Sequence, residues 1–98
     1  MSIWKDCKAS LLYFSKDAAD ENEPRTVKIT PEEILVEYVD EDAGLIQYKG
    51  KNNGDGHFEL VSEQVRGRAT LHRFAESTLL EGSWVEDGER GMWKIELA

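Results

Sequence analysis

The sequence is poor in the residues that usually build disulfide-rich, metal-binding and membrane-spanning proteins. Its single cysteine, Cys7, cannot form a disulfide within the chain. Two histidines and this cysteine show no C-x-x-C or H-x-x-x-H spacing, so we expect no metal site and no cofactor. No apolar run approaches the ~18 residues of a membrane helix, and the first ten residues lack the apolar core of a signal peptide. These features favour a protein of the cytoplasm.

Positive charge is also scarce in this chain. Its 12 lysines and arginines stand against 20 aspartates and glutamates, which gives a formal net charge of −8. We therefore expect no nucleic-acid partner, because phosphate backbones are bound chiefly by basic side chains. Hydrophobic residues make up 40% of the sequence and charged residues 33%, as is ordinary for a soluble globular chain. The length predicts one domain, residues 1–98.

The clearest local pattern predicts a β-hairpin over residues 78–97. Apolar and polar residues alternate on both sides of Asp87-Gly88, a pair that favours a two-residue type I′ turn. With this turn, Trp84 and Trp93 each lie across from a glycine, so that each indole covers bare backbone. The two tryptophans share one face of the hairpin, and we expect both to be buried.

The register of this hairpin has one alternative. The two-residue turn sets Glu86 against Glu89, and like charges directly opposite each other are unfavourable. A four-residue loop would instead pair Trp84 with Trp93. Both registers keep the tryptophans on one face, whereas a one-residue slip would separate them and is disfavoured.

The rest of the chain predicts further strands joined by short turns. We expect strands at residues 3–14, 27–29, 34–40, 45–51, 57–63 and 67–74. Thr30-Pro31-Glu32-Glu33 would also suit the start of a short helix, but the β-branched and aromatic residues after it favour a turn and a strand. The acidic segment from Lys16 to Arg25 has the composition of an exposed, mobile loop.

Together these elements predict an all-β fold. We expect a single-domain antiparallel meander of about eight short strands that closes, or nearly closes, into a small barrel. Closure would remove the exposed sheet edges. Gly82-Ser83-Trp84 resembles the G-x-W of lipocalin-like barrels over three residues, although theirs lies near the start of the chain. This resemblance is compatible with a calycin-like architecture and implies no function.

Aromatic residues on the predicted inner faces define a candidate ligand site. We expect six ligand-binding residues: Tyr48, Trp84, Trp93, Arg68, Thr70 and His72. The three aromatic residues lie beside glycines, and aromatic walls with gaps between them are typical of concave apolar sites. The three polar residues would orient a ligand if their strand turns them inward. If Leu71 is the inward residue, all three face outward.

Two classes of function are open. The first is a non-catalytic binding module for a small apolar or aromatic molecule or for a protein partner. An interior cavity would favour the small ligand, and a filled interior would favour a protein-binding surface. The second is a small hydrolase or isomerase that uses His57 or His72 with a carboxylate, which requires that histidine to lie in the cavity near an acid. Because no phosphate loop, G-x-S-x-G motif or Ser/His/Asp order is present, we expect a binding module.

Overall fold

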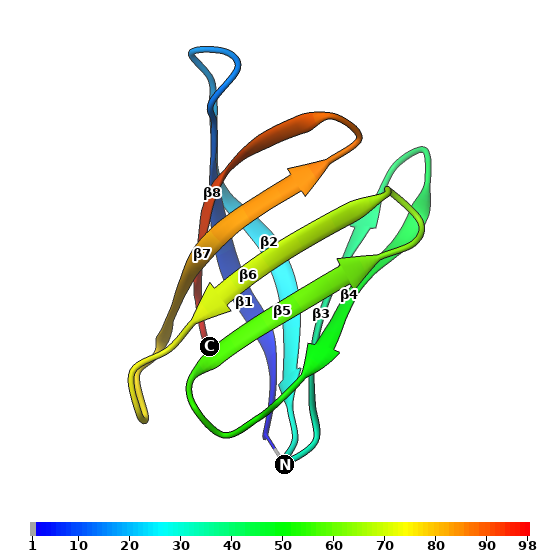
Figure 1. Ribbon diagram of the computed structural model, residues 1–98. Coiled ribbons are helices and arrows are strands. Elements are labelled where there is room, and N and C mark those ends of the chain that lie inside the picture. Colours follow the sequence, from blue (N-terminus) through cyan, green and yellow to red (C-terminus); the bar gives the residue numbers. More distant parts are fainter. Residues whose placement is uncertain (1) are drawn as a thin grey trace.

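The computed structural model describes residues 2–98, and in this range it contains eight strands and no helix. The strands are β1 (Ser2–Tyr13), β2 (Ala19–Ile29), β3 (Glu33–Asp40), β4 (Gly44–Lys51), β5 (His57–Ser62), β6 (Gly67–His72), β7 (Leu79–Glu86) and β8 (Glu89–Glu96). Each strand pairs antiparallel with the next, and β8 pairs with β1 to close a barrel (Figure 1). The predicted all-β meander of eight strands is confirmed. Within residues 2–98, no helix is long and apolar enough to cross a membrane.

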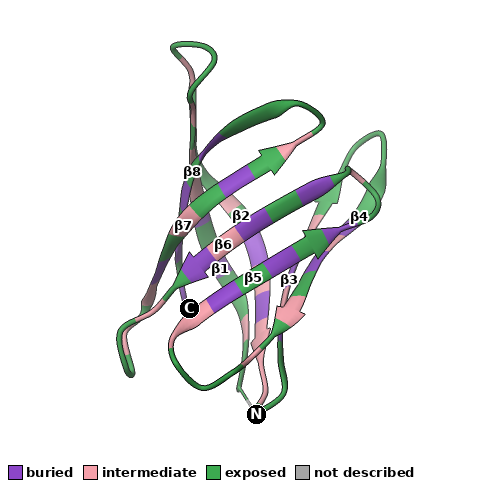
Figure 2. Ribbon diagram, in the orientation of Figure 1, coloured by how far each residue is buried: buried purple, intermediate pink, exposed green. Residues whose placement is uncertain are grey.

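One face of each strand points into the barrel. Buried residues recur at every second position, such as Ile34 and Val36 in β3, and Phe58 and Leu60 in β5. Figure 2 shows this period as alternating purple and green bands along β5 and β6. The alternation follows from strand geometry, because successive side chains leave a strand on opposite faces.

The hairpin formed by β7 and β8 has the two-residue turn. Asp87 and Gly88 have φ angles of 50° and 87°, as a type I′ turn requires. Each tryptophan lies across from a glycine. The exposed fraction is 5% for Trp84 and 4% for Trp93, which confirms that both belong to the core.

The glycines opposite the tryptophans allow a close approach between strands. A Cβ atom at Gly82 would collide with the carbonyl oxygen of Thr70, and one at Gly91 would collide with that of Leu12. The same Thr70 oxygen accepts a hydrogen bond of 3.1 Å from Nε1 of Trp93. The indole is therefore fixed by a polar contact as well as by packing.

The segment after Thr30, where the sequence also suited a short helix, forms a turn and then a strand, as predicted. The Thr30 hydroxyl accepts hydrogen bonds from the backbone N–H groups of Glu32 and Glu33, at 3.2 and 3.0 Å. These bonds resemble a helix cap, but the chain enters β3 at Glu33. Ile34 and Val36 are fully buried there, and this burial outweighs the local helix signal.

The prediction of a loop from Lys16 to Arg25 is wrong after residue 18. Residues 19–25 form the first half of β2 and pair with β1, and this hairpin extends beyond the others in Figure 1. Pairing with β3 covers only residues 26–29, so the first half of β2 has one neighbour. Its side chains are mostly exposed, and no apolar alternation marks it as a strand. A strand with a single neighbour also tolerates Pro24.

Replacing Trp93 with alanine should lower the free energy of unfolding by about 3–5 kcal/mol, because it removes a buried aromatic side chain and leaves a cavity. Met92→Ala is the matched control, since Met92 is the adjacent residue of β8 and is 51% exposed. Urea denaturation followed by circular dichroism measures both variants. A loss below about 1 kcal/mol for Trp93→Ala would mean that this ring is not a core residue.

Candidate functional site

A cavity of about 420 Å³ opens at one end of the barrel. The β1–β2, β3–β4, β5–β6 and β7–β8 turns gather at this end, which is the upper end in Figure 1. The lining comes from six strands, β1 to β4, β7 and β8, and from Glu41 in the β3–β4 turn. Its aromatic residues are Tyr13, Tyr38, Tyr48, Trp84 and Trp93. Its ionisable side chains are Arg25 and the acids Asp20, Glu23, Asp40, Glu41, Glu86 and Glu89.

Two aromatic pairs form the apolar part of the cavity wall. The rings of Tyr48 and Trp93 have centroids 5.7 Å apart, and those of Tyr13 and Trp84 meet edge to face at 5.2 Å. Such tilted and edge-to-face pairs are favoured by the ring quadrupoles. Nε1 of Trp84 donates to the Met92 carbonyl at 3.1 Å. The ring planes are thus set before any ligand binds.

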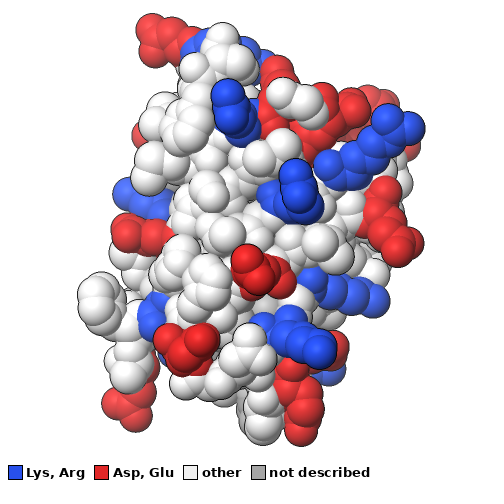
Figure 3. Space-filling model, viewed as in Figure 1, with Lys and Arg blue, Asp and Glu red and all other residues white. Residues whose placement is uncertain are grey.

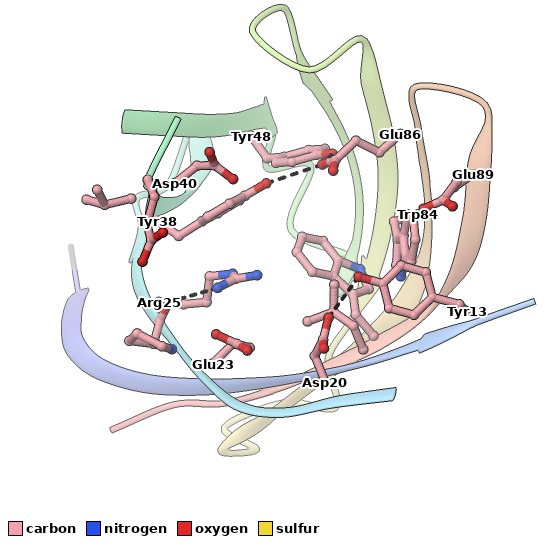
Figure 4. Close-up of a pocket in the computed structure, with 15 residues that line it drawn as sticks. Tyr13, Asp20, Glu23, Arg25, Tyr38, Asp40, Tyr48, Trp84, Glu86 and Glu89 are labelled. Carbon is pink, nitrogen blue, oxygen red and sulfur yellow. Dashed lines mark hydrogen bonds between the residues drawn. The ribbon is translucent and has the colours of Figure 1, made fainter. Parts of the chain in front are cut away.

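A carboxylate and two phenols form a polar cluster beside these rings. Oε1 of Glu86 accepts hydrogen bonds from the hydroxyls of Tyr48 and Tyr38, at 2.6 and 3.2 Å (Figure 4). Burial, together with the Glu86 carboxylate, raises the pKa of both tyrosines above the ordinary value. Both phenols therefore remain protonated donors at neutral pH. This contact also explains how Glu86 tolerates Glu89 across the ladder, since its carboxylate bonds to the phenols.

Arg25 brings a buried positive charge to the same cluster. Its side chain is 8% exposed, and its guanidinium lies 3.9 Å from the ring centroid of Tyr38. Nη1 donates to the Pro24 carbonyl at 2.9 Å, whereas Nε has no hydrogen-bond partner within residues 2–98. Burial lowers the pKa of Arg25, but an arginine side chain keeps its proton in proteins. The guanidinium points toward the middle of the cavity in Figure 4.

The opening of the cavity is acidic. Figure 3 shows red acidic side chains at this upper end together with blue basic ones, but among residues 2–98 only Arg25 is a basic residue of the cavity lining. Oδ1 of Asp40 accepts the backbone N–H groups of Asp42 and Ala43, at 2.8 and 2.9 Å. These bonds lower the pKa of Asp40 and keep its carboxylate ionised. A ligand entering the cavity therefore passes negative charge first.

The structure brings together three of the six predicted site residues. Tyr48, Trp84 and Trp93 line the cavity. The other three, Arg68, Thr70 and His72, lie on the outer face of β6, because the residues between them, Ala69 and Leu71, are the buried ones.

On that outer face, Thr70 and His72 contact polar side chains of the neighbouring strands. Thr70 Oγ1 lies 3.0 Å from Ser83 Oγ on β7. Nε2 of His72 lies 2.7 Å from Nδ1 of His57 on β5. Neither histidine belongs to the cavity lining.

Sequence reasoning missed the polar residues that lie inside the barrel. Arg25 precedes Val27 by two positions, Tyr38 follows Val36 by two, and Glu86 follows Trp84 by two. Each therefore continues the inward face of its strand, and the period-two pattern that located the aromatic residues could also have located these three. The sequence analysis instead took its polar candidates from residues 67–74, where the alternation turns Arg68, Thr70 and His72 outward.

Comparison of the chain with protein-family models gives no match, and comparisons with curated proteins and with solved structures give none either. Any function therefore rests on the geometry of the cavity and on the side chains that line it. These side chains combine an aromatic wall, a buried cation and an acidic opening.

The Tyr13 hydroxyl provides a test of the cavity geometry by its pH dependence. It donates to Oδ2 of Asp20 at 2.8 Å, and this hydrogen bond, followed by burial, raises the pKa of Tyr13 from 10.0 to about 12. The folded state favours the protonated phenol, so its stabilising contribution is fully present below pH 10.0 and is lost as the pH rises toward about 12.

Asp20→Asn should therefore return the pKa of Tyr13 toward 10.0 in an NMR titration of the tyrosine rings. Asp17→Asn serves as the control, because Asp17 is an exposed acid of the neighbouring turn that makes no described contact with this hydroxyl. Equal Tyr13 pKa values in the wild type and Asp20→Asn would contradict the hydrogen bond.

Proposed function

We propose that this protein is a non-catalytic binding module that holds a small molecule with an aromatic or apolar part. The observation that carries the proposal is the cavity of about 420 Å³ beside Tyr48, Trp84 and Trp93. An eight-stranded barrel is either filled by side chains or holds one small ligand. The volume lies within the ~300–1,000 Å³ of ordinary small-molecule sites. Depressions of about 410 and 450 Å³ also lie on the outer face of the sheet, so the five aromatic residues and the buried Arg25 of the lining, and not the volume, favour a small ligand here.

The fixed orientation of the aromatic rings also supports this function. Both indole N–H groups donate to backbone carbonyls, and the Tyr38 and Tyr48 hydroxyls both donate to Glu86. Binding to a site that is already ordered avoids part of the entropy that is lost when side chains become fixed. These rings therefore lose little conformational freedom when a ligand binds beside them.

The positions of the histidines favour binding over catalysis. A hydrolase or isomerase of the kind considered above needs His57 or His72 beside a carboxylate in the cavity. The two imidazoles instead contact each other on the outer face, and neither has a described side-chain hydrogen bond to an acid. A catalytic role therefore has less support than a binding role.

A fluorescence titration with a broad panel of small aromatic molecules tests this function. A ligand beside Trp84 and Trp93 should quench or shift the tryptophan emission, and Trp84→Phe should weaken the response. Trp4→Phe is the matched control, because Trp4 packs near Arg73 and does not line the cavity. The response should persist in that variant. If no molecule of the panel changes the tryptophan emission, or if the change is lost in Trp4→Phe, the proposed site is ruled out.

A further inference from the structure

Arg25 is a buried cation without an anionic partner. Its side chain is nine-tenths buried, Nε is unpartnered, and no carboxylate of residues 2–98 lies within 4.0 Å of its guanidinium. The carboxylates of Glu23 and Glu86 both raise the pKa of Arg25 without forming an ion pair with it, Glu23 more than Glu86, and Glu86 is bonded to two tyrosines. Burying a charge is costly unless the charge is paired. Nε is enclosed by protein and Nη1 donates to Pro24, so the guanidinium offers its remaining Nη donors to a carboxylate that enters the cavity.

The acidic residues at the opening of the cavity favour a positively charged group on the ligand. Asp20, Asp40 and Glu41 are exposed acids of the lining, and Glu23 is half-buried. Glu89 is also exposed, but its carboxylate forms an ion pair of 3.5 Å with Lys16. Exposed charges are screened by salt within about 8 Å at physiological ionic strength, whereas a buried charge is screened much less. The interaction with Arg25 therefore dominates at the bottom of the site, and the acids act mainly on the outer end of a ligand.

Aromatic rings line the cavity between these charges, and the half-buried Tyr13 and Tyr38 are more exposed than the core residues Tyr48, Trp84 and Trp93. Trp93 and Tyr48 lie side by side at the bottom, and Trp84 and Tyr13 form a second pair. A flat or apolar middle part of a ligand would contact these rings. The site thus combines a buried cation beside Tyr38, an aromatic wall and exposed acids at the opening.

We infer that the ligand of this cavity is a small zwitterion with a carboxylate at one end and a positively charged group at the other. The carboxylate pairs with Arg25, the middle part packs on the aromatic rings of the lining, and the positive group faces the acids of the opening. This inference rests on the proposed function and names the chemical class of its ligand. A simple anion would meet the acidic opening, and a simple cation would meet Arg25.

Three matched probes test the inference by NMR titration of the wild-type protein. They are para-aminomethylbenzoate, which carries both charges, para-methylbenzoate, which carries only the carboxylate, and para-methylbenzylamine, which carries only the ammonium. We expect the first to bind about tenfold or more tightly than the other two, since it gains a charge-assisted pair. The Arg25 Nε–H signal should shift with the zwitterion and not with the amine.

Two arginine variants test whether the affinity for the zwitterion depends on Arg25. Arg25→Gln should weaken binding of para-aminomethylbenzoate by about tenfold to a hundredfold, as expected for loss of a hydrogen bond to a charged group. Arg68→Gln is the matched control, because Arg68 is an exposed arginine on the outer face of β6, and it should leave the affinity unchanged. If Arg25→Gln does not fold, the Nε–H signal of the wild type still decides the question.

The outcomes separate this inference from the proposed function. If either single-charge probe binds as tightly as the zwitterion, or if the affinity is the same in Arg25→Gln, the inference is overturned while binding in the cavity stands. If none of the three probes shifts any cavity signal, the inference is likewise overturned. The proposed function then fails only if the broad aromatic panel also gives no fluorescence response.

Discussion

The ladder between β1 and β8, which runs from Lys8 opposite Glu96 to Tyr13 opposite Gly91, closes the sheet into a barrel. Closure turns one face of all eight strands toward a single interior, and the other features of the protein depend on it. Eight strands enclose a space that side chains can just fill. Where the inward residues are aliphatic, the barrel is packed, and where they are polar or aromatic, a cavity remains.

The polar side chains inside the open end of the barrel differ in how fully their hydrogen bonds are made. Glu86 receives two phenolic hydrogen bonds, whereas Arg25 is left with an unpartnered Nε and without an ion pair. A hydrophobic residue at position 25 would continue the packing of Val27 and would avoid the cost of a buried charge. Groups that break the rules of stable packing are most often found at functional sites. The position of Arg25 in the cavity is consistent with this rule.

Much of the fold could be predicted, because its signals are local. Alternating apolar residues marked most strands, and Asp87-Gly88 marked the tightest turn. The same reasoning failed at residues 19–25, where β2 has a single neighbour and no buried face to impose a period on the sequence. For the site, the two-residue period of each strand located Tyr48, Trp84 and Trp93. The residues that were assigned to orient the ligand lie on the outer face of β6.

By itself, the sequence determined which residues share a face of each strand and where the chain turns. These properties depend on the two-residue period of a strand and on the φ angles of a few turn residues. Only the tertiary structure decided which inward residues meet. Arg25, Tyr38, Tyr48 and Glu86 come from four different strands and lie together because the closed barrel sets them at one level. The period along one strand does not specify the relative height of its neighbours, and so the polar cluster emerges only when the sheet closes.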